Sequence, residues 1–344
     1  MNKKIYLIRS NSTRFGGAEN YLYRLSNALK KENLDHEVIH SSLPKFIPSW
    51  ARALLFNMQL CLTKKEKFYY SLDRITCPDL YRAGDGVHKV FISIEKKSKL
   101  NLLHLVYLYL ERHCFNNSKY IIANSNMIKK QITDTYDISS NKIKVIYNGI
   151  ELKNLNYPKS FNKLSKEFLI KEGQPVLLYV GSGFKRKGVA EFLKIFSELQ
   201  TKDIRAFVIG KEKNIKYYKN LSKDLKIHNQ VTFTGPRLDV DDFYAISDIF
   251  LFPTHYDPFS NVVLEAMNFE NAVFTTNSNG ASEILDKNFI MNEPYDPKVI
   301  SSIDNLLADK ASLNEVKIKN KKISQLFSIK NNLDKTLEVI NLIE

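Results

Sequence analysis

The chain of 344 residues contains only three cysteines, 12 glycines and 10 prolines. An odd number of cysteines without a C-x-x-C pair predicts reduced cytosolic thiols and gives no metal signature. The low glycine and proline content argues against disorder. No stretch reaches the roughly 18 apolar residues that span a bilayer, and the apolar run Ile5–Ile8 is too short for a signal peptide. The length predicts two globular domains.

The net charge of +14 is concentrated in the first half of the chain. Residues 1–150 carry 24 Lys and Arg against 12 Asp and Glu, whereas residues 151–344 carry 27 against 25. This asymmetry favours an anionic partner for the first half, either a nucleic acid or an anionic membrane surface. A lysine-rich solvated surface would produce the same numbers.

Runs typical of buried strands alternate with helical patterns along the chain, which predicts βαβ units and doubly wound parallel sheets. In the second half we expect strands at 175–180, 206–210, 231–235, 249–252 and 272–276. In the first half we expect strands at 4–9, 37–40, 119–123 and 142–147, whereas residues 41–80 are hard to assign.

These elements predict two Rossmann-like domains and a final helix. The domains cover residues 1–152 and 167–325, and the polar segment 153–166, which contains Pro158, is expected to be the linker. Residues 326–344 are expected to form a helix that packs back on the first domain.

Two carboxylates, Asp257 and Glu265, stand eight positions apart around an expected helix start. A polar loop that leaves a buried strand and opens a helix is where α/β sheets hold phosphate-bearing ligands. Asp257 followed by Pro258 also fits a helix N-cap with a first-turn proline.

A second loop, G-S-G-F-K-R-K-G at 181–188, joins an expected strand to an expected helix. Its small residues let a ligand approach the backbone, and Arg186 and Lys187 supply positive charge. A diphosphate leaving group needs such charge, because negative charge builds on it as the bond breaks. A basic surface turn is the alternative.

Together the two stretches resemble the family 4 glycosyltransferases of the GT-B fold. Asp257 takes the first place of the E-x7-E signature, and Ser182 stands where the G-R-x4-K-G element has Arg. The G-S-x-F-x-R-K-G variant is similar to the lipopolysaccharide core glucosyltransferase branch. The resemblance implies two Rossmann-like domains that face a cleft. It implies retaining transfer of a hexose from a nucleotide-sugar, expected to be a UDP-sugar, to a lipid-linked glycan such as lipooligosaccharide core. It implies no metal and no other cofactor.

The resemblance also implies roles for individual residues. Arg186 and Lys187 would stabilise the leaving diphosphate, with Arg186 replacing the charge missing at Ser182. Asp257 would contact the donor sugar and Glu265 the ribose. The amides of 260–262 would face the diphosphate at the positive end of the helix dipole. The other implied donor-binding positions are Gly16, Gly17, Gly183, Arg237, Phe259, Ser260, Asn261 and Val262, and Gly280–Ala–Ser–Glu283 resembles the family's G-x-x-E.

The loop R-A-G-D-G-V-H at 82–88 resembles the acceptor-side loop of the same branch. There Asp85 would orient or deprotonate the acceptor hydroxyl, with His88 as a second acceptor-side residue. An Asx turn with a surface histidine is the alternative. The D-x-D at Asp239 and Asp241 precedes a short helix, so we expect helix capping there and no metal site.

We relate the excess positive charge to two neighbouring segments, the basic segment Lys89–Lys99 and the apolar run Leu100–Leu110. The run either lies at a membrane interface or is a buried helix. We expect a cytoplasmic enzyme held peripherally on the inner face of the cytoplasmic membrane, with no nucleic-acid partner. The alternatives are a nucleotide-sugar epimerase of the same fold, a basic nucleic-acid-binding protein and a non-catalytic polysaccharide-binding module.

Overall fold

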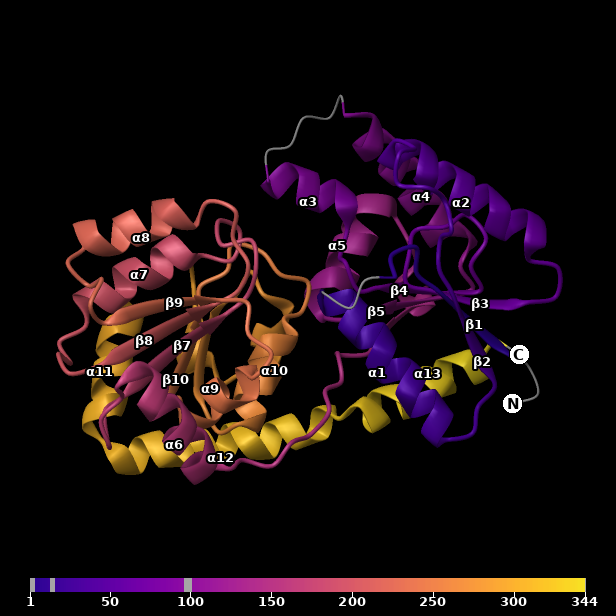
Figure 1. Cartoon of the computed structure of the whole chain (residues 1–344). Helices are drawn as coiled ribbons and strands as arrows, with labels where there is room; N and C mark the ends of the chain where they lie inside the picture. The colour runs from indigo at the N-terminus through magenta and orange to yellow at the C-terminus, as the bar shows by residue number, and fades with distance from the viewer. Residues whose placement is uncertain (1–3, 13–15, 96–100, 344) are drawn as a thin grey trace. The chain divides into compact units, whose positions relative to one another are not determined.

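The computed structural model describes residues 4–12, 16–95 and 101–343 (Figure 1). The chain forms two compact units. Unit 1 comprises Met1–Glu151 and Phe327–Glu344, and unit 2 comprises Leu152–Leu326.

Unit 1 contains a parallel six-stranded sheet in the order β2-β1-β3-β4-β5-β6. Its strands are β1 (Ile5–Ile8), β2 (His36–Ile39), β3 (Phe68–Ser71), β4 (Leu80–Ala83), β5 (Tyr120–Ala123) and β6 (Ile143–Val145). Its helices are α1 (Gly17–Lys31), α2 (Ser49–Thr63), α3 (His88–Ile94), α4 (Leu102–Asn117), α5 (Asn126–Tyr136) and α13 (Ile329–Asn341), with a short 3-10 turn at Ser140–Lys142.

Alternating strand residues bury against helices on both faces of this sheet, as strand geometry requires. Ile5 and Leu7 of β1 pack in one cluster with Leu25 of α1 and Leu333 of α13. Ile8, on the opposite face, packs with residues of α2. The sheet is therefore doubly wound, and its strand order reverses between β1 and β3.

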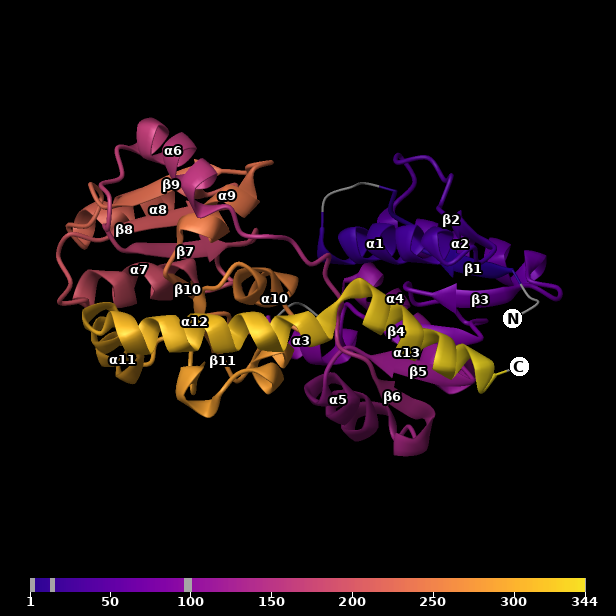
Figure 2. The same ribbon diagram turned by 90° about the horizontal axis from the view of Figure 1, so that it is seen from below.

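Unit 2 contains a second parallel six-stranded sheet in the order β12-β11-β10-β7-β8-β9. Its strands are β7 (Val176–Val180), β8 (Arg205–Ile209), β9 (Val231–Gly235), β10 (Ile249–Phe252), β11 (Ala272–Thr276) and β12 (Ile290–Met291). Its helices are α6 (Tyr157–Phe168), α7 (Val189–Glu198), α8 (Ile215–Asp224), α9 (Val240–Ile246), α10 (Asn261–Asn268), α11 (Lys298–Ala308) and α12 (Lys310–Ser324), with 3-10 turns at Gly280–Ile284, Lys287–Phe289 and Gln325–Phe327. Figure 1 shows α7 and α8 on one face of this sheet and α6, α9 and α12 on the other, and in Figure 2, the view from below, α12 lies in front of the strands.

The expected linker is wrong in one respect, because most of it is helical. Helix α6 occupies Tyr157–Phe168 and packs on α9 within unit 2. The Asn156 side chain caps its first turn, and the proline that suggested a loop lies at its start, where the missing N–H costs nothing. Phe168 then packs its ring against Phe207 and Phe243.

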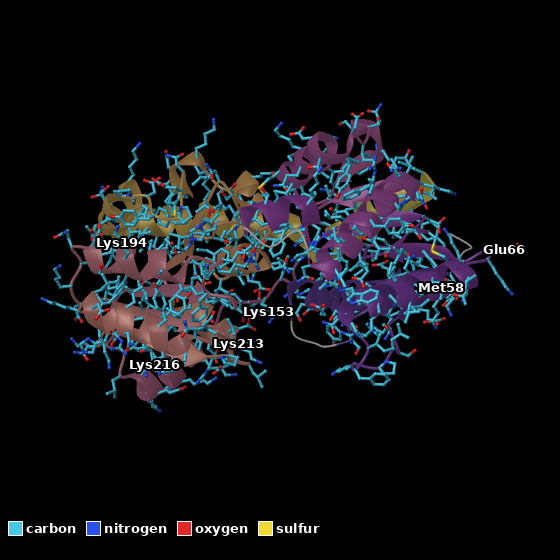
Figure 3. The ribbon with its side chains drawn as sticks, turned by 90° about the horizontal axis from the view of Figure 1, so that it is seen from above. Met58, Glu66, Lys153, Lys194, Lys213 and Lys216 are labelled. Carbon is cyan, nitrogen blue, oxygen red and sulfur yellow. A yellow bond between two sulfur atoms is a disulfide. The ribbon has the colours of Figure 1, made fainter. Side chains whose placement is uncertain are left out.

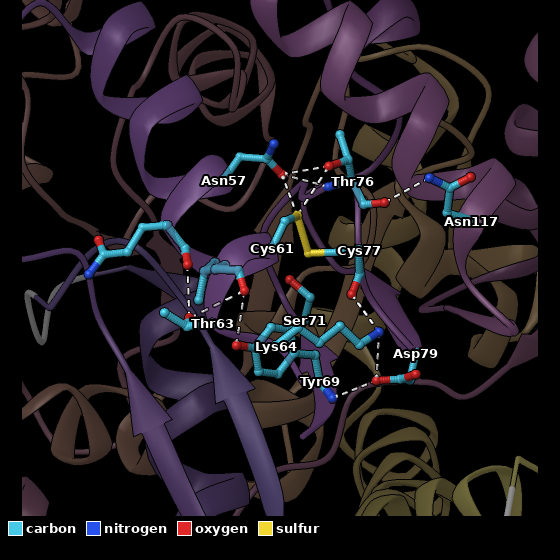
Figure 4. Close-up of a disulfide and its surroundings, with 12 residues drawn as sticks. Asn57, Cys61, Thr63, Lys64, Tyr69, Ser71, Thr76, Cys77, Asp79 and Asn117 are labelled. Atoms are coloured by element: carbon cyan, nitrogen blue, oxygen red, sulfur yellow. Dashed lines mark hydrogen bonds and ion pairs between the residues drawn. A yellow bond between two sulfur atoms is a disulfide. The ribbon is translucent and has the colours of Figure 1, made fainter. Parts of the chain in front are cut away.

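The expectation of reduced thiols is also wrong for two of the three cysteines. Cys61 at the end of α2 forms a disulfide with Cys77 in the loop after β3, with their Cα atoms 5.7 Å apart (Figure 4). Cys114 is a buried free thiol. The region 41–80 turns out to hold α2 and β3, and the pairing depends on how α2 folds onto the sheet, which cysteine spacing does not reveal.

Candidate active site

Two loops of unit 2 lie beside each other at the centre of its sheet. One is the loop at 181–188, which carries Arg186 and Lys187, and the other follows β10 and carries Asp257. β7 and β10 are hydrogen-bonded neighbours at the point where the strand order reverses, which is where open α/β sheets bind ligands. The His255 amide donates to the Arg186 carbonyl at 2.9 Å. Gly188 has φ +78°, and a Cβ there would lie 1.8 Å from the Pro253 carbonyl oxygen, so only glycine permits this approach.

Lys187 and Asp257 form an ion pair between these loops, with their side chains only 12% and 11% exposed. Burial alone would raise the pKa of the Asp257 carboxyl, but the adjacent Lys187 ammonium outweighs it, and this pKa lies below its usual value. Burial lowers the pKa of Lys187, and Asp257 offsets part of that effect. The site therefore holds a lysine cation whose charge the protein itself balances.

Arg186 supports the same loop. Its Nη1 donates to the Tyr256 carbonyl at 2.8 Å, and its charge also lowers the pKa of Asp257. The side chain is half-buried. Arg186 thus adds positive charge beside Lys187 while it holds the residue that precedes Asp257.

Asp257 does not cap a helix, contrary to one of the two sequence interpretations. Helix α10 begins at Asn261 with Ser260 as its N-cap. The Asp257 Oδ1 accepts a hydrogen bond from the Phe259 amide at 3.1 Å, which closes a turn before the helix. Phe259 is buried. The proline therefore belongs to this turn and not to the first turn of α10.

The amide of Ser260 is already engaged, which corrects the expectation of three amides facing a ligand. It donates to Oδ1 of Asn279 at 3.2 Å. Asn261 and Val262 occupy the first turn of α10, where backbone N–H groups lack partners within the helix. Sequence patterns did not single out Asn279, since a lone asparagine in a turn carries no signature.

Glu265 lies in the second turn of α10 and is half-buried. The Tyr244 hydroxyl donates to its Oε2 at 3.4 Å from the buried side of the helix. The nearby Gly280 amide donates to the Asp257 carbonyl at 2.9 Å, so the G-x-x-E turn joins the same loop cluster. Glu283, the last residue of that motif, is exposed.

Ser182 ties the loop after β7 to the loop after β8, because its Oγ accepts from the Lys211 amide at 3.0 Å. The next residue, Gly183, has φ +74°. Glu212 accepts a hydrogen bond from the Phe184 amide at 2.9 Å, which is a second contact between these two loops. Glu212 was missed by the sequence analysis, since it lies outside every motif.

Arg237 is occupied by carboxylates, which argues against its expected contact with a nucleotide base. It makes paired contacts with Glu167 at 2.6 and 3.0 Å and with Asp239 at 2.8 Å. Lys163 also contacts Asp239, and Lys153 contacts Asp241 at 2.5 Å. Both carboxylates of the D-x-D are therefore paired with cations. Within 4–12, 16–95 and 101–343, no group of three His, Cys, Asp or Glu side chains could hold a metal ion.

Unit 1 gathers three carboxylates around Arg9 at the reversal point of its sheet. Arg9 follows β1, and its guanidinium contacts Asp73 at 2.9 Å, Asp85 at 2.8 Å and Glu19 at 2.9 Å. Burial alone would lower the pKa of Arg9, but the carboxylates raise it well above its usual value. Gly16, with φ +137°, leaves room for Glu19 in this cluster: a Cβ on Gly16 would lie 2.2 Å from a carboxylate oxygen. Arg9 was not predicted, because nothing marks a single arginine after a strand.

The Gly-Gly loop before α1 is described only from Gly16 onward, with Gly17 as the first residue of the helix. Residue 15, which directly precedes Gly16, lies outside the described residues. The Gly16 carbonyl accepts from the Asn20 amide at 3.0 Å and starts the helix.

Asp85 is the exposed member of the Arg9 cluster, with its side chain 38% exposed. Desolvation would raise the pKa of Asp85, but the charges of Arg9 and Arg74 hold it below its usual value. A carboxylate with a lowered pKa is a poor proton acceptor and a good hydrogen-bond acceptor at neutral pH. Of the two roles considered for Asp85, orienting a hydroxyl fits this environment better.

His88 is buried and does not form the surface histidine of the alternative interpretation. Its amide donates to Glu111 at 2.6 Å, and its Nε2 lies 3.1 Å from Nδ1 of His104. Burial, followed by the charge of Arg74, lowers the pKa of His88 to about 4, so the ring is neutral at neutral pH. His88 therefore fixes the start of α3 behind the Asp85 loop.

Comparison with known proteins identifies the family. Residues 160–323 match the family model "Glycosyl transferases group 1", and residues 86–154 match "Glycosyltransferase Family 4". The lipopolysaccharide glucosyltransferase WaaG of Escherichia coli K12 is 28% identical over 239 residues, which cover 65% of this chain and 63% of that protein. Other curated relatives are matched over about half of their length, for example 51% and 53%.

Solved structures of similar fold cover nearly the whole chain. The crystal structure of WaaG superposes with a TM-score of 0.81 at 19% identity and covers 98% of this chain and 99% of that chain. The Anabaena protein HepE, solved in complex with UDP and glucose, gives a TM-score of 0.78 at 18% identity and covers 99% and 100%. The two doubly wound sheets, the loops at their reversal points and the two family models agree, and the chain belongs to the family 4 glycosyltransferases of the GT-B fold.

Proposed function

We propose that the protein is a retaining glycosyltransferase that moves a hexose from a UDP-sugar to a lipid-linked glycan. The observation that carries this proposal is the Lys187–Asp257 pair beside the start of α10, at the reversal point of the unit 2 sheet. A cation and a helix N-terminus at one loop cluster suit a diphosphate. The HepE structure with UDP and glucose supports a nucleotide-sugar donor in this fold.

In this proposal the leaving diphosphate is stabilised by Lys187, Arg186 and the first-turn amides of α10, without a metal ion. Glu265 holds the ribose hydroxyls, supported by the buried Tyr244 hydroxyl. Asp257 holds Lys187 in place and lies next to the donor sugar. On the acceptor side, Asp85 accepts a hydrogen bond from the acceptor hydroxyl. As the bond between the sugar and the diphosphate breaks, the acceptor oxygen bonds to the anomeric carbon, and a donor phosphate oxygen takes the proton of the acceptor hydroxyl.

The acceptor class is proposed from the relatives and from the charge of unit 1. WaaG acts on lipopolysaccharide by its name, and a relative from Campylobacter jejuni is named for a diphospho-undecaprenol acceptor. An acceptor that carries a lipid lies at a membrane, and residues 1–150 have a net charge of +12. A lipooligosaccharide core or another lipid-linked glycan fits both observations.

Helices α2 and α4 of unit 1 pack on each other (Figure 1). Both helices expose apolar side chains. We propose that this surface, together with the net positive charge of residues 1–150, holds the protein peripherally on the inner face of the cytoplasmic membrane. The exposed apolar residues are Trp50, Leu55, Met58 and Leu62 of α2 and Leu102, Leu105 and Tyr109 of α4, and Figure 3 labels Met58. Of the basic segment Lys89–Lys99, the structure describes only residues 89–95, and residues 96–100 lie outside the described part. Across the described residues, none of the helices has the length and apolar character to cross a bilayer.

A panel of UDP-sugars tests the proposed donor. We expect one UDP-hexose to raise the melting temperature and to be hydrolysed slowly in the absence of acceptor, releasing the sugar and UDP. A free epimerised sugar nucleotide as the product would contradict transfer and favour an epimerase. Failure of every UDP-sugar to shift the melting temperature would contradict the donor assignment.

A further inference from the structure

Asn279 is a fully buried side chain that is hydrogen-bonded to two loops of the proposed donor site and to strand β11. Its Oδ1 accepts from the Ser260 amide at 3.2 Å and from the Ala281 amide at 3.1 Å. Its Nδ2 donates to Thr275 Oγ1 at 3.0 Å. One side chain thus joins the N-cap of α10, the G-x-x-E turn and the end of β11.

The backbone around Asn279 extends this connection to the Asp257 turn. The Asp257 amide donates to the Ser278 carbonyl at 3.0 Å, and the Gly280 amide donates to the Asp257 carbonyl at 2.9 Å. Asp257 and Asn279 therefore form an isolated parallel bridge. Asp257 in turn holds Lys187. The proposed diphosphate site depends on the position of this turn.

The chemistry of the side chain requires an amide at this position. Two backbone N–H groups point at one oxygen, which fixes Oδ1 there and leaves the NH2 group toward Thr275. The Thr275 hydroxyl donates its proton to the Phe252 carbonyl at 2.8 Å, so it can only accept from residue 279. An aspartate would keep both acceptors but lose the donor, and it would add negative charge beside the start of α10.

We propose that Asn279 is a positioning residue for the donor diphosphate: it fixes the N-terminus of α10 and the Asp257 turn in the geometry that binds phosphate. This inference rests on the proposed function. The residue has no exposed surface, so it acts through Ser260 and Asp257 and not by touching the substrate. Holding the amides in place before the ligand arrives removes an ordering cost from binding.

Asn271 provides a matched control at the opposite end of the same strand. It is also fully buried and also makes three side-chain hydrogen bonds, to the carbonyls of Tyr244, Ser247 and Phe269. It immediately precedes β11, at the amino end of the strand, whereas Asn279 follows the carboxyl end. Substitution of either residue removes buried hydrogen bonds, but only Asn279 is bonded to the N-cap of α10 and lies between the two residues whose backbone bonds Asp257.

The test compares Asn279→Ala, Asn279→Asp and Asn271→Ala in the full chain by titration calorimetry with UDP and UMP and by thermal melting. We expect both alanine variants to melt at lower temperature, and only Asn279→Ala to bind UDP about tenfold more weakly, with a smaller loss for UMP, which lacks the second phosphate. UDP affinity at the wild-type level in Asn279→Ala, or an equal loss in Asn271→Ala, would overturn the inference.

Asn279→Asp keeps the inference testable if the alanine variant does not fold. It retains two acceptor oxygens for the Ser260 and Ala281 amides, and we expect weaker UDP binding because its charge opposes the diphosphate. Unchanged UDP affinity in this variant would overturn the inference. A wild-type protein that binds no nucleoside diphosphate would overturn the proposed function itself, whereas wild-type binding with unaffected Asn279 variants overturns only the role of Asn279.

Discussion

Lys187 and Asp257 neutralise each other in a site proposed to bind a diphosphate. Both side chains are nearly excluded from solvent, and burial works against the charge of each. Breaking such a pair by removing one partner leaves an uncompensated buried charge, which typically destabilises a protein by about 3–5 kcal/mol. An anionic ligand changes the balance, because it offers Lys187 a second partner.

Removing the charge of Asp257 tests this balance. In Asp257→Asn, Lys187 loses the carboxylate that competes with the ligand, so we expect UDP to bind at least as tightly as to the wild type. Turnover with the UDP-sugar should fall about tenfold or more, because asparagine keeps the oxygen that closes the turn but removes the negative charge beside the donor sugar. Titration calorimetry and steady-state kinetics measure the two effects, and UDP binding weakened tenfold would show that Asp257 supports the site in another way.

Single residues show clearly which parts of the site the sequence could predict. Lys187, Asp257 and Glu265 stand in spaced motifs, and the structure brings the first two into contact. Arg9 and Asn279 belong to no motif and act through contacts with residues far away in the chain. The ion pair of Arg237 with Glu167 was not predicted either, because the two residues lie 70 positions apart.

At the scale of elements, helix α2 is attached to the sheet of unit 1 by the Cys61–Cys77 disulfide and by a group of hydrogen bonds around it (Figure 4). Lys64, just after the helix, contacts the Cys77 carbonyl at 2.8 Å and Asp79 at 3.1 Å. The Tyr69 hydroxyl donates to the Leu60 carbonyl at 3.2 Å. The end of α2 is therefore held at several points.

Thiol titration tests the pairing. The unreduced, denatured chain should react with one equivalent of thiol reagent, from Cys114, and the reduced chain with three. Reduction should lower the free energy of unfolding by about 3 kcal/mol, as expected for a short loop. The variant Cys61→Ser/Cys77→Ser is the control, since its stability should not respond to reductant. Three reactive thiols before reduction would contradict the pairing.

His88, the first residue of α3, should make the stability of unit 1 sensitive to acid. The pKa of His88 is about 4 in the folded protein against 6.5 in the unfolded chain, so the unfolded state binds a proton first as the pH falls. The stabilisation is complete above pH 6.5 and is lost as the pH falls toward 4, by at most ~3 kcal/mol. Thermal melting between these pH values should show a steeper loss for the wild type than for His88→Gln, and identical profiles would contradict the buried neutral histidine.

The elements themselves were predicted with uneven success. The strands around the motifs of unit 2 were found because parallel strands buried on both faces are continuous apolar runs, as in β10. Helix α6 was missed because its polar sequence and proline resemble a linker, although it packs on α9 through one apolar side. Residues 41–80 were unclear because α2 leaves several apolar residues exposed and its periodicity is weak.

At the scale of the whole molecule, the charge excess lies in the first half of the chain together with the exposed apolar residues of α2 and α4. Basic residues near an anionic bilayer each contribute about 1 kcal/mol, and exposed apolar side chains add to this at the interface. The Cys61–Cys77 disulfide removes reduced thiols as a ground for the proposed cytoplasmic location.

Liposome flotation tests the proposed membrane surface. We expect the protein to float with anionic vesicles and much less with neutral ones, and binding should weaken as salt rises. Leu62→Glu, which changes a residue that is 75% exposed on α2, should reduce flotation without lowering the melting temperature. The control Leu169→Glu changes a residue of unit 2 that is 83% exposed and should float like the wild type. Equal flotation with anionic and neutral vesicles would contradict the proposal.

We propose that Lys187 binds the diphosphate of the donor. A single Lys187 substitution would leave Asp257 buried and unpaired, so the informative comparison is Asp257→Asn against Lys187→Met/Asp257→Asn, in which only the lysine differs. The direct measurement is the UDP dissociation constant of these two variants by titration calorimetry. We expect the single variant to bind UDP. The double variant should bind UDP at least about tenfold more weakly although it melts no lower, because it no longer buries an unpaired charge. Equal affinity in the two variants would contradict the claim.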